Sequence, residues 1–274
     1  MTELQLQKGA KRSRRVVGRL LALLFFVAAF GAWFALDPGF RHGVSAAEAA
    51  SNMSKDEFEK RVHDYLLAHP EVVTEAVNLL EARQHEQEAA VAQAALKSRV
   101  DEVFRDPNSP IGGNPKGDAT LVEFFDYNCP YCHQMASVMI EAEKADPGLR
   151  VVYKEFPILG PNSLFAAKAA LAADRQGKYV AFHRALYQVR GPVDESKVLE
   201  VAKTVGLDVS RLKTDMQDPK ISAQLDKNIE LARVLNINGT PGFVIGEKVL
   251  TGATDLKSLQ TVIASARKAP VTNQ

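Results

Sequence analysis

The sequence has very few cysteines, and this scarcity limits what the chain can be. Only Cys129 and Cys132 occur among 274 residues, too few for the disulfide framework of a small secreted domain. A structural zinc site needs four ligands, and no second cysteine pair is present to complete one. Methionine-rich and histidine-rich segments are also missing, so the composition does not favour a dedicated copper carrier.

The net charge of the chain is small, +1, and the charged residues are unevenly distributed. Residues 1–19 contain six basic residues and one acid, a net of +5, so the rest of the chain carries −4. Beyond the N-terminus the sequence has no basic excess, and nucleic-acid binding is not expected. The composition, 46% hydrophobic and 24% charged, is that of a globular protein rather than a disordered or collagen-like chain.

The region 1–49 has the pattern of an export signal or a membrane anchor. Residues 20–36 form an unbroken apolar run of 17 residues after the basic segment, which predicts a cytoplasmic N-terminus and an exported remainder. This length is short for a membrane-spanning helix, whereas Ala47-Glu48-Ala49, which resembles a cleavage site, lies far beyond the run. A cleaved signal peptide and an uncleaved inner-membrane anchor both remain open.

Residues 50–105 are predicted to form a helical extension. Ser54 and Glu57 form a capping box ahead of apolar residues at helical spacing, and Pro70 suits the start of a second helix. Two helices of this size do not bury an apolar face by themselves. Self-association of residues 54–105 into a homo-oligomer is one interpretation, and a solvated connecting helix is the other.

A run of turn-forming residues at 106–117 predicts a linker, and residues 118–270 are predicted to form an α/β domain. Ala119 to Phe125 is apolar on nearly all positions, as expected for a strand covered on both faces. A helical pattern follows, and then a second apolar strand from Arg150 to Phe156. This order is typical of a βαβ unit with parallel strands.

The second half of this domain begins with helices alone. Residues 157–236 show five helical patterns and no strand, which predicts a helical insertion. Gly246-Glu247 lies between two short apolar segments and predicts a hairpin, and Asp255 to Ala266 predicts a closing helix. The predicted order is therefore βαβ, helical insertion, ββα, with no internal repeat.

The two cysteines follow the first strand and open the next helix, the context in which Cys-x-x-Cys is a redox motif. Cys129 lies at the helix N-terminus, where free backbone N–H groups and the helix dipole favour a thiolate, so it is the predicted nucleophile. Cys132, one turn further, is predicted to be buried and to resolve the mixed disulfide. The pattern indicates a thiol–disulfide oxidoreductase whose redox group is the Cys129–Cys132 disulfide, with no metal or other cofactor.

Two motifs that are far apart in the sequence resemble those of a known family. Cys129-Pro130-Tyr131-Cys132 after the first strand, and Gly239-Thr240-Pro241-Gly242 before the hairpin, look like the thioredoxin fold over about residues 115–269. The insertion and Val122-Glu123-Phe124-Phe125 resemble its DsbA-like branch, and the extension is similar to the N-terminal region of suppressor-of-copper-sensitivity C proteins. The resemblance implies a periplasmic location, cysteine-containing exported proteins as substrates and a membrane redox partner that recycles the site.

The resemblance also implies roles for individual residues. Pro241 is expected to be cis and to face the cysteines, and Thr240 to offer its backbone to a bound peptide strand. Glu123 falls at the position of a buried acid that moves the proton of the resolving thiol, and burial there raises a carboxyl pKa. The alternative for Glu123 is a strand-end carboxylate that reaches solvent.

Several residues around the cysteines are expected to tune the site or contact substrate. Pro130 and Tyr131 modulate the potential, and His133 either adds a favourable charge to the thiolate or is simply a solvated residue. Tyr127 and Asn128 are candidates for substrate contact. Cys129-x-x-Cys132-His133 also fits c-type haem attachment, but the motif follows a buried strand and haem leaves Thr240-Pro241 unexplained.

The direction of the chemistry has three interpretations. An isomerase-like or specialised role, with an oligomer presenting several sites, is favoured by residues 54–105 and Thr240. A monomeric DsbA-like oxidase that introduces disulfides is the alternative. A third is Cu(I) binding by two soft thiolates without catalysis.

Overall fold

The computed structural model describes residues 53–268. The apolar run 20–36, and with it the predicted anchor, lies outside these residues. Within them, no helix is long and apolar enough to cross a membrane. The chain divides into two compact units, one up to Leu79 and the other from Leu80 onward.

The first unit is helical, as predicted. Helix α3 (Lys55–Ala68) begins at Ser54, whose hydroxyl accepts a hydrogen bond from the Glu57 backbone N–H at 3.2 Å, so the predicted cap is present. Helix α4 (Glu71–Ser98) starts in this unit and ends in the second. None of the residues of α3 is buried, although its sequence contains apolar residues at helical spacing.

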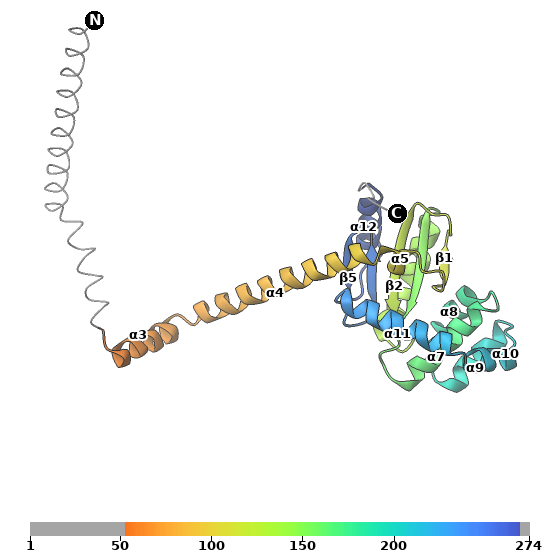
Figure 1. Cartoon of the computed structure of the whole chain (residues 1–274), viewed down its shortest axis with the longest axis horizontal. Helices are drawn as coiled ribbons and strands as arrows, with labels where there is room; N and C mark the ends of the chain where they lie inside the picture. The colour runs from red at the N-terminus through yellow and green to blue at the C-terminus, as the bar shows by residue number, and fades with distance from the viewer. Residues whose placement is uncertain (1–52, 269–274) are drawn as a thin grey trace, which may run out of the picture. The chain divides into compact units, whose positions relative to one another are not determined.

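The second unit is built on a five-stranded sheet of order β1-β3-β2-β4-β5 (Figure 1). Strands β2 (Ala119–Phe125) and β3 (Leu149–Glu155) are parallel, and β4 (Gly242–Ile245) pairs antiparallel with β2. Strand β5 (Lys248–Thr251) completes the hairpin with β4. The predicted α/β fold with a βαβ unit and a terminal hairpin is confirmed.

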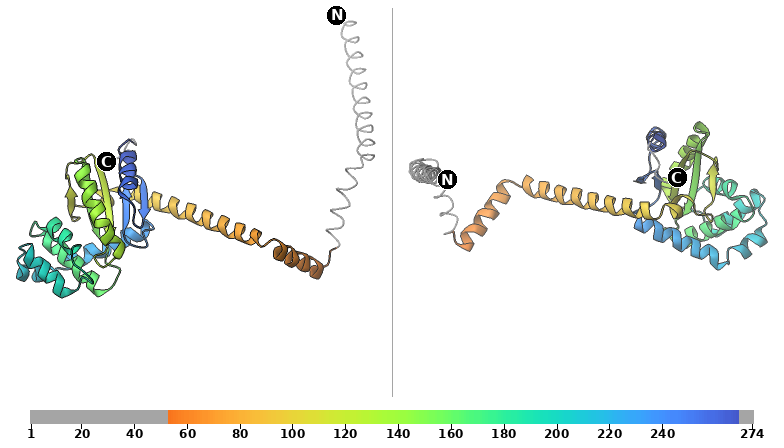
Figure 2. Two further views of the ribbon diagram at one scale, coloured as in Figure 1. Left: turned by 180° about the vertical axis from the view of Figure 1, so that it is seen from behind. Right: turned by 45° about the horizontal axis from the view of Figure 1, so that its top comes forward.

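Both faces of the sheet are covered, which explains why β2 is apolar at nearly every position. One face packs against α6 (Pro130–Ala145) and α12 (Leu256–Lys268), which lie side by side over the sheet in the view from behind (Figure 2). The other face packs against α5 (Val100–Phe104), α11 (Pro219–Val234) and Leu96 near the end of α4. Because side chains alternate along a strand, successive residues of β2 and β3 enter different cores.

The predicted helical insertion is also present, with no strand between residues 157 and 236 of the described chain. It consists of α7 (Pro161–Asp174), α8 (Tyr179–Leu186), α9 (Glu195–Thr204), α10 (Val209–Asp215) and α11. Aspartates cap three of these helices, because a carboxylate oxygen satisfies a free backbone N–H of the first turn. The caps are Asp194, Asp208 and Asp218.

The range 106–117 differs from the predicted linker. It contains the strand β1 (Ile111–Gly113), which pairs antiparallel with β3, Ile111 opposite Val152. Three residues, two of them glycine, have little strand propensity of their own. The edge of β3 therefore imposes this strand, and local sequence does not reveal it.

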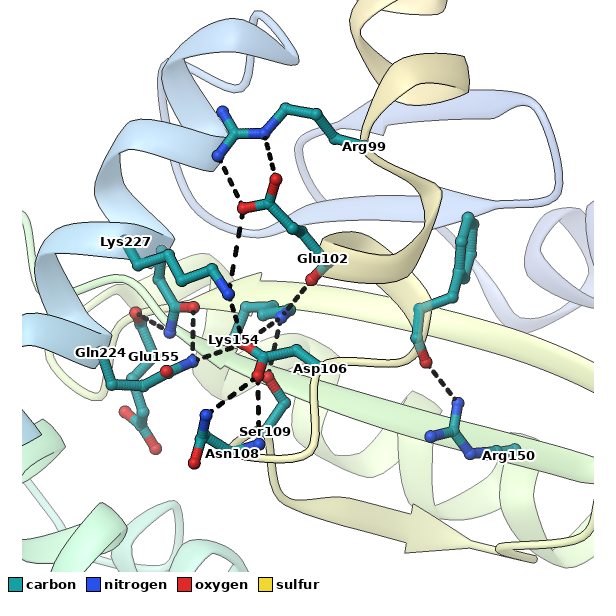
Figure 3. A network of polar contacts seen from close by, with 12 residues as sticks. Arg99, Glu102, Asp106, Asn108, Ser109, Arg150, Lys154, Glu155, Gln224 and Lys227 are labelled. Carbon is teal, nitrogen blue, oxygen red and sulfur yellow. Dashed lines mark hydrogen bonds and ion pairs between the residues drawn. The ribbon is translucent and has the colours of Figure 1, made fainter. Parts of the chain in front are cut away.

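A buried lysine attaches the segment that precedes β1 to the sheet (Figure 3). Lys154 of β3 has a fully buried side chain, and its Nζ donates to the Glu102 carbonyl and the Ser109 hydroxyl, both at 2.7 Å, and contacts Asp106 at 3.5 Å. Asp106 also accepts from the Gln224 amide of α11 at 2.9 Å. Every donor of the ammonium group is thus paired, as a buried charge requires.

Candidate active site

Cys129 is the N-cap of α6, and Pro130 is the first residue of the helix. Proline is well tolerated there because the helix does not use that N–H. Cys129 therefore lies at the positive end of the helix dipole, a position that favours a negatively charged group. Both cysteines are free thiols, and Cys129 is 5% exposed against 1% for Cys132.

Cys132 lies one helical turn further, beneath Cys129. Burial raises the pKa of Cys132 far above the ordinary thiol value. A hydrogen bond from the Asp126 backbone lowers this pKa, and the charge of Glu123 raises it further. The two sulfurs thus differ in position: Cys129 caps the helix and donates to the Thr240 carbonyl, whereas Cys132 is buried and holds its proton. For Cys132 to act as a nucleophile, a nearby base must take that proton.

The loop before β4 faces the cysteines. The Thr240–Pro241 peptide bond is cis, and the Cys129 thiol donates a hydrogen bond to the Thr240 carbonyl oxygen at 3.1 Å. The Pro241 carbonyl accepts from the Gly252 backbone N–H at 2.8 Å, which fixes the loop to the end of β5. The structure thus brings together the two motifs, which are 111 residues apart in the sequence.

Glu123 lies on the face of β2 that packs against α6, and it is buried, with 3% of its surface exposed. Burial, with a smaller contribution from the charge of Glu143, raises its pKa to about 8. The alternative of a carboxylate that reaches solvent does not agree with this position. A carboxyl with such a pKa exchanges protons readily near neutral pH, as a base for Cys132 must.

His133 and Tyr131 point to different surroundings. The His133 Nε2–H donates to the Tyr127 carbonyl oxygen at 2.8 Å, and the ring edge packs against Tyr187. His133 therefore holds the active-site loop and is not a freely solvated residue. Tyr131 is 59% exposed and lies between the two cysteines in sequence.

Asp126 and Asn128 hold the active-site loop against the insertion, a role that the sequence analysis missed. The Asp126 carboxylate accepts from the Ser163 hydroxyl and from the backbone N–H groups of Asn128, Ile158 and Leu159. Asn128 exchanges hydrogen bonds with the Val193 backbone, 65 residues away. Tyr127, predicted with Asn128 to contact substrate, is 1% exposed and faces the core.

A second buried carboxyl, Glu155, was also missed. Its Oε1 accepts from the Tyr127 hydroxyl at 3.0 Å and the Tyr179 hydroxyl at 2.6 Å, and Oε2 has no partner among the described residues. Burial raises the pKa of Glu155 well above its usual range. The Tyr127 hydroxyl also contacts His183 Nδ1 at 3.1 Å, and burial lowers the pKa of that imidazole to about 3. The sequence feature that could have identified Glu155 is an acidic residue within a strand that is otherwise buried.

Metal ligands are not gathered at this site. Within residues 53–268, no group of three or more histidine, cysteine and acidic side chains is placed to hold a metal ion. The chemistry that the described geometry offers is that of one reactive thiol, one protonated thiol and one buried acid.

Comparisons with known proteins agree with this arrangement. Residues 120–264 match the family described as DSBA-like thioredoxin domain, and residues 55–87 match the copper resistance protein ScsC N-terminal domain. These matches confirm the resemblance that the cysteine motif, the insertion and the extension indicated.

Solved structures of two bacterial proteins illustrate the similarity. A thioredoxin-like oxidoreductase from Silicibacter pomeroyi is 48% identical, with a TM-score of 0.61, over 62% of this chain and 98% of that one. BcfH from Salmonella enterica Typhimurium is 30% identical, with a TM-score of 0.66, over 82% of this chain and 99% of that one.

The match to a curated relative covers only part of that protein. The Na(+)/H(+) antiporter NhaA 1 of Salinispora arenicola is 26% identical over 158 residues, which are 57% of this chain but only 24% of that protein. The chain thus spans about a quarter of the length of this curated relative.

Proposed function

This chain belongs to the family of DSBA-like thioredoxin domains, and we propose that it is an exported thiol:disulfide oxidoreductase that acts on cysteines of other proteins. One observation carries the proposal. The Cys129 thiol lies at the N-terminus of α6 and donates to the Thr240 carbonyl, with the protonated Cys132 buried one turn below it. This is the arrangement of an attacking and a resolving thiol.

The reaction has two steps. The Cys129 thiolate attacks a substrate disulfide, forms a mixed disulfide and releases one substrate thiolate. The Cys132 sulfur then attacks Cys129 Sγ, its proton passes to the Glu123 carboxylate, and the second substrate cysteine leaves as a thiolate. The substrate disulfide gains two electrons, and the Cys129–Cys132 pair loses them. The reverse sequence oxidises a substrate dithiol.

The backbone of Thr240 is the proposed site for the substrate chain. In the free protein its carbonyl accepts the Cys129 thiol hydrogen. When Cys129 is in a mixed disulfide, that hydrogen is gone and the carbonyl is free to accept a backbone N–H from an extended substrate peptide. Backbone pairing of this kind is independent of side chains and suits a protein with many substrates.

The favoured direction is isomerase-like or specialised, in a homo-oligomer formed through residues 54–105. Helix α3 has no buried residue, and large apolar side chains of α3 and α4 are exposed, including Phe58 at 57%, Tyr65 at 55% and Leu67 at 70%. Exposed apolar surface of this extent is typical of an interface. The match of residues 55–87 to the ScsC N-terminal domain supports a dedicated role for this unit.

Export and recycling complete the proposal. The basic residues 1–19 and the apolar run 20–36 favour export, with the run as a signal or as an inner-membrane anchor. A membrane redox partner would restore the working state of the Cys129–Cys132 pair after each turnover. Cysteine-containing exported proteins are the substrates.

The reduction potential of the Cys129–Cys132 pair tests the proposal, by equilibration of the protein with glutathione. We expect a reversible two-electron couple near about −180 to −230 mV, the range of isomerases and glutaredoxins. A potential near about −120 mV would instead indicate the monomeric DsbA-like oxidase. Tight Cu(I) binding without any such couple would overturn the redox function and favour a copper-tolerance protein.

Sedimentation velocity tests the oligomer separately. The wild-type chain is expected to sediment as an oligomer, and Phe58→Asp is expected to sediment as a monomer because a charge does not fit an apolar interface. His63→Asp, a charge change at an exposed polar position of the same helix, is the matched control. A monomeric wild type would remove the oligomer and leave the redox chemistry standing.

A further inference from the structure

A small cavity beside Glu123 lies between β2, β3, α6 and α8. Its lining includes Glu123, Tyr153, Glu143, Arg184 and Tyr187, and its volume of about 10 Å³ is room for about one water molecule. The Tyr187 hydroxyl and the Arg184 Nε are buried there without a hydrogen-bond partner among the described residues. Buried polar atoms of this kind are usually satisfied by an internal water.

An open cleft lies on the outer side of the same residues. It is lined by parts of β1, the end of α6 and the turn that follows it, including Asn114, Lys144 and Asp146. Only Ile140, Glu143 and Arg184 line both the cavity and the cleft. Solvent in the cleft and the buried carboxyl of Glu123 are therefore separated by these three side chains.

Glu143, one of these three side chains, accepts hydrogen bonds with both of its carboxylate oxygens. Its Oε1 accepts from the Tyr153 hydroxyl at 3.2 Å, and its Oε2 accepts from the Arg184 guanidinium at 2.6 Å. Tyr153 lies directly opposite Glu123 in the pairing of β2 with β3. A chain of polar groups thus leads from beside Glu123 to the surface of α6.

We propose that Glu143, held by Tyr153 and Arg184, is the outlet of a proton path that connects the Cys132 thiol with solvent. The inference rests on the proposed function and adds to it the route by which Glu123 is reset. When Cys132 attacks the mixed disulfide, its proton passes to the Glu123 carboxylate. Glu123 then gives a proton to the water of the cavity, and Glu143 carries a proton to the cleft. Reduction of the Cys129–Cys132 disulfide moves a proton inward by the same route.

Other titratable groups surround Glu123. They come from α6, from β3 and from the end of α8, and they are Cys132, Glu143, Tyr153, Glu155, His183, Arg184 and Tyr187. Only Glu143 and Arg184 among them also line the cleft. The proton that leaves Glu123 therefore has one polar exit in this part of the chain.

The test follows the step in which Cys132 resolves the mixed disulfide. The reduced full chain is mixed with oxidised glutathione, quenched with acid at intervals, and the Cys129–glutathione adduct is followed by mass spectrometry from pH 6 to pH 10. In the wild type, we expect the first-order decay of the adduct to accelerate with pH and to level off near pH 8, where Glu123 ionises.

Glu143→Gln keeps the shape of the side chain and removes the carboxylate that accepts and releases the proton. We expect the decay to slow by about tenfold, less than the effect of a direct general base because Glu143 acts through Glu123. We expect its inflection to move to lower pH because a neighbouring negative charge is lost. Glu141→Gln, an exposed acid on the same helix that lines neither space, is the matched control and is expected to leave both quantities unchanged.

Tyr153→Phe gives a second reading if Glu143→Gln does not fold, since it removes only the hydroxyl that donates to Glu143. It is also expected to slow the decay. An unchanged rate and pH profile in a folded Glu143→Gln or Tyr153→Phe chain would overturn the proton path, as would an equal change in Glu141→Gln. If the wild type forms no adduct that decays to a Cys129–Cys132 disulfide, the proposed function itself fails.

Discussion

Lys154 and Glu155 are neighbours in β3, yet their side chains lie on opposite faces of the sheet. One has a partner of opposite charge and the other does not. Lys154 is surrounded by oxygen atoms from the segment before β1 and faces the Asp106 carboxylate. Glu155, like Glu123 on the same face, forms no ion pair among the described residues, and tyrosine hydroxyls donate to the Glu155 carboxyl. Burial of both acids is compensated by a bound proton rather than by a partner charge.

The two faces also respond to pH in opposite directions. Burial alone would raise the pKa of Asp106, but the hydrogen bonds from Gln224 and Asn108 and the charges of Lys154 and Lys227 lower it to about 2. Its contribution to stability is therefore present above its usual value of 3.8 and is lost as the pH falls toward 2. The raised pKa of Glu123 makes stability fall as the pH rises. The Lys154–Asp106 pair stabilises the fold, whereas Glu123, which has no ion pair, can exchange a proton.

Glu123→Gln is the strongest test of this comparison. In the wild type, the folded chain holds a proton on Glu123 up to about pH 8, whereas the unfolded chain loses it near 4.5, so the free energy of unfolding falls across this interval. Glutamine has no charge to bury. We expect the variant to be more stable than the wild type by about 5 kcal/mol at pH 9, at roughly 1.4 kcal/mol per pKa unit, as measured by urea unfolding.

The same urea series at pH 3.5 is the control, because Glu123 is then mostly protonated in the folded and in the unfolded chain, and the two chains should unfold at similar urea concentrations. A wild-type chain whose stability is as flat with pH as that of Glu123→Gln would show that Glu123 is not a buried acid with a raised pKa.

Lys154→Met should have the next largest effect, and with the opposite sign. It removes the ammonium group and leaves the Asp106 carboxylate buried, which costs about 3 kcal/mol of unfolding free energy. The expected value is at the low end because Gln224 and Lys227 still contact Asp106. Urea unfolding at pH 7 measures the loss, and the reduction potential of the cysteine pair is expected to stay unchanged.

Lys227→Met is the matched control, since this lysine also contacts Asp106 but is 38% exposed, and exposed pairs contribute less than about 1 kcal/mol. Adding Asp106→Asn to Lys154→Met should recover part of the loss, because no charge is then left unpaired. Equal losses for Lys154→Met and Lys227→Met would contradict the distinction between the buried and the exposed cation.

Glu155→Gln should have the smallest effect. A protonated carboxyl and an amide are both neutral, and the remaining side-chain oxygen still accepts from Tyr127 and Tyr179. We expect a change of less than about 1 kcal/mol at pH 7, compared with about 2 kcal/mol for Glu155→Ala, which removes both hydrogen bonds. A loss for Glu155→Gln as large as that for Lys154→Met would mean that Glu155 is charged in the folded chain.

Much of this fold follows from local patterns. The apolar strands, the capping residues and the Gly246-Glu247 turn predicted the βαβ unit, the insertion and the hairpin close to their observed bounds, because each pattern acts over a few residues. Strand β1 escaped prediction because its pairing with β3 gives it its conformation. The roles of Asp126 and Asn128 escaped because their partners, Ser163 and Val193, are 37 and 65 residues away.

The sequence by itself determined the order of the elements from β2 onward, the position of Cys129 at the start of a helix and the presence of acids in buried strands. These depend on side-chain periodicity and on helix ends, which are local properties. The tertiary structure decided which buried charge has a partner. Lys154 meets Asp106 across 48 residues and Asp106 meets Gln224 across 118, whereas no basic side chain pairs with Glu123 or Glu155 among the described residues. Such pairings depend on which chain segments pack against each face of the sheet, and that packing makes Lys154 structural and leaves Glu123 available to exchange a proton.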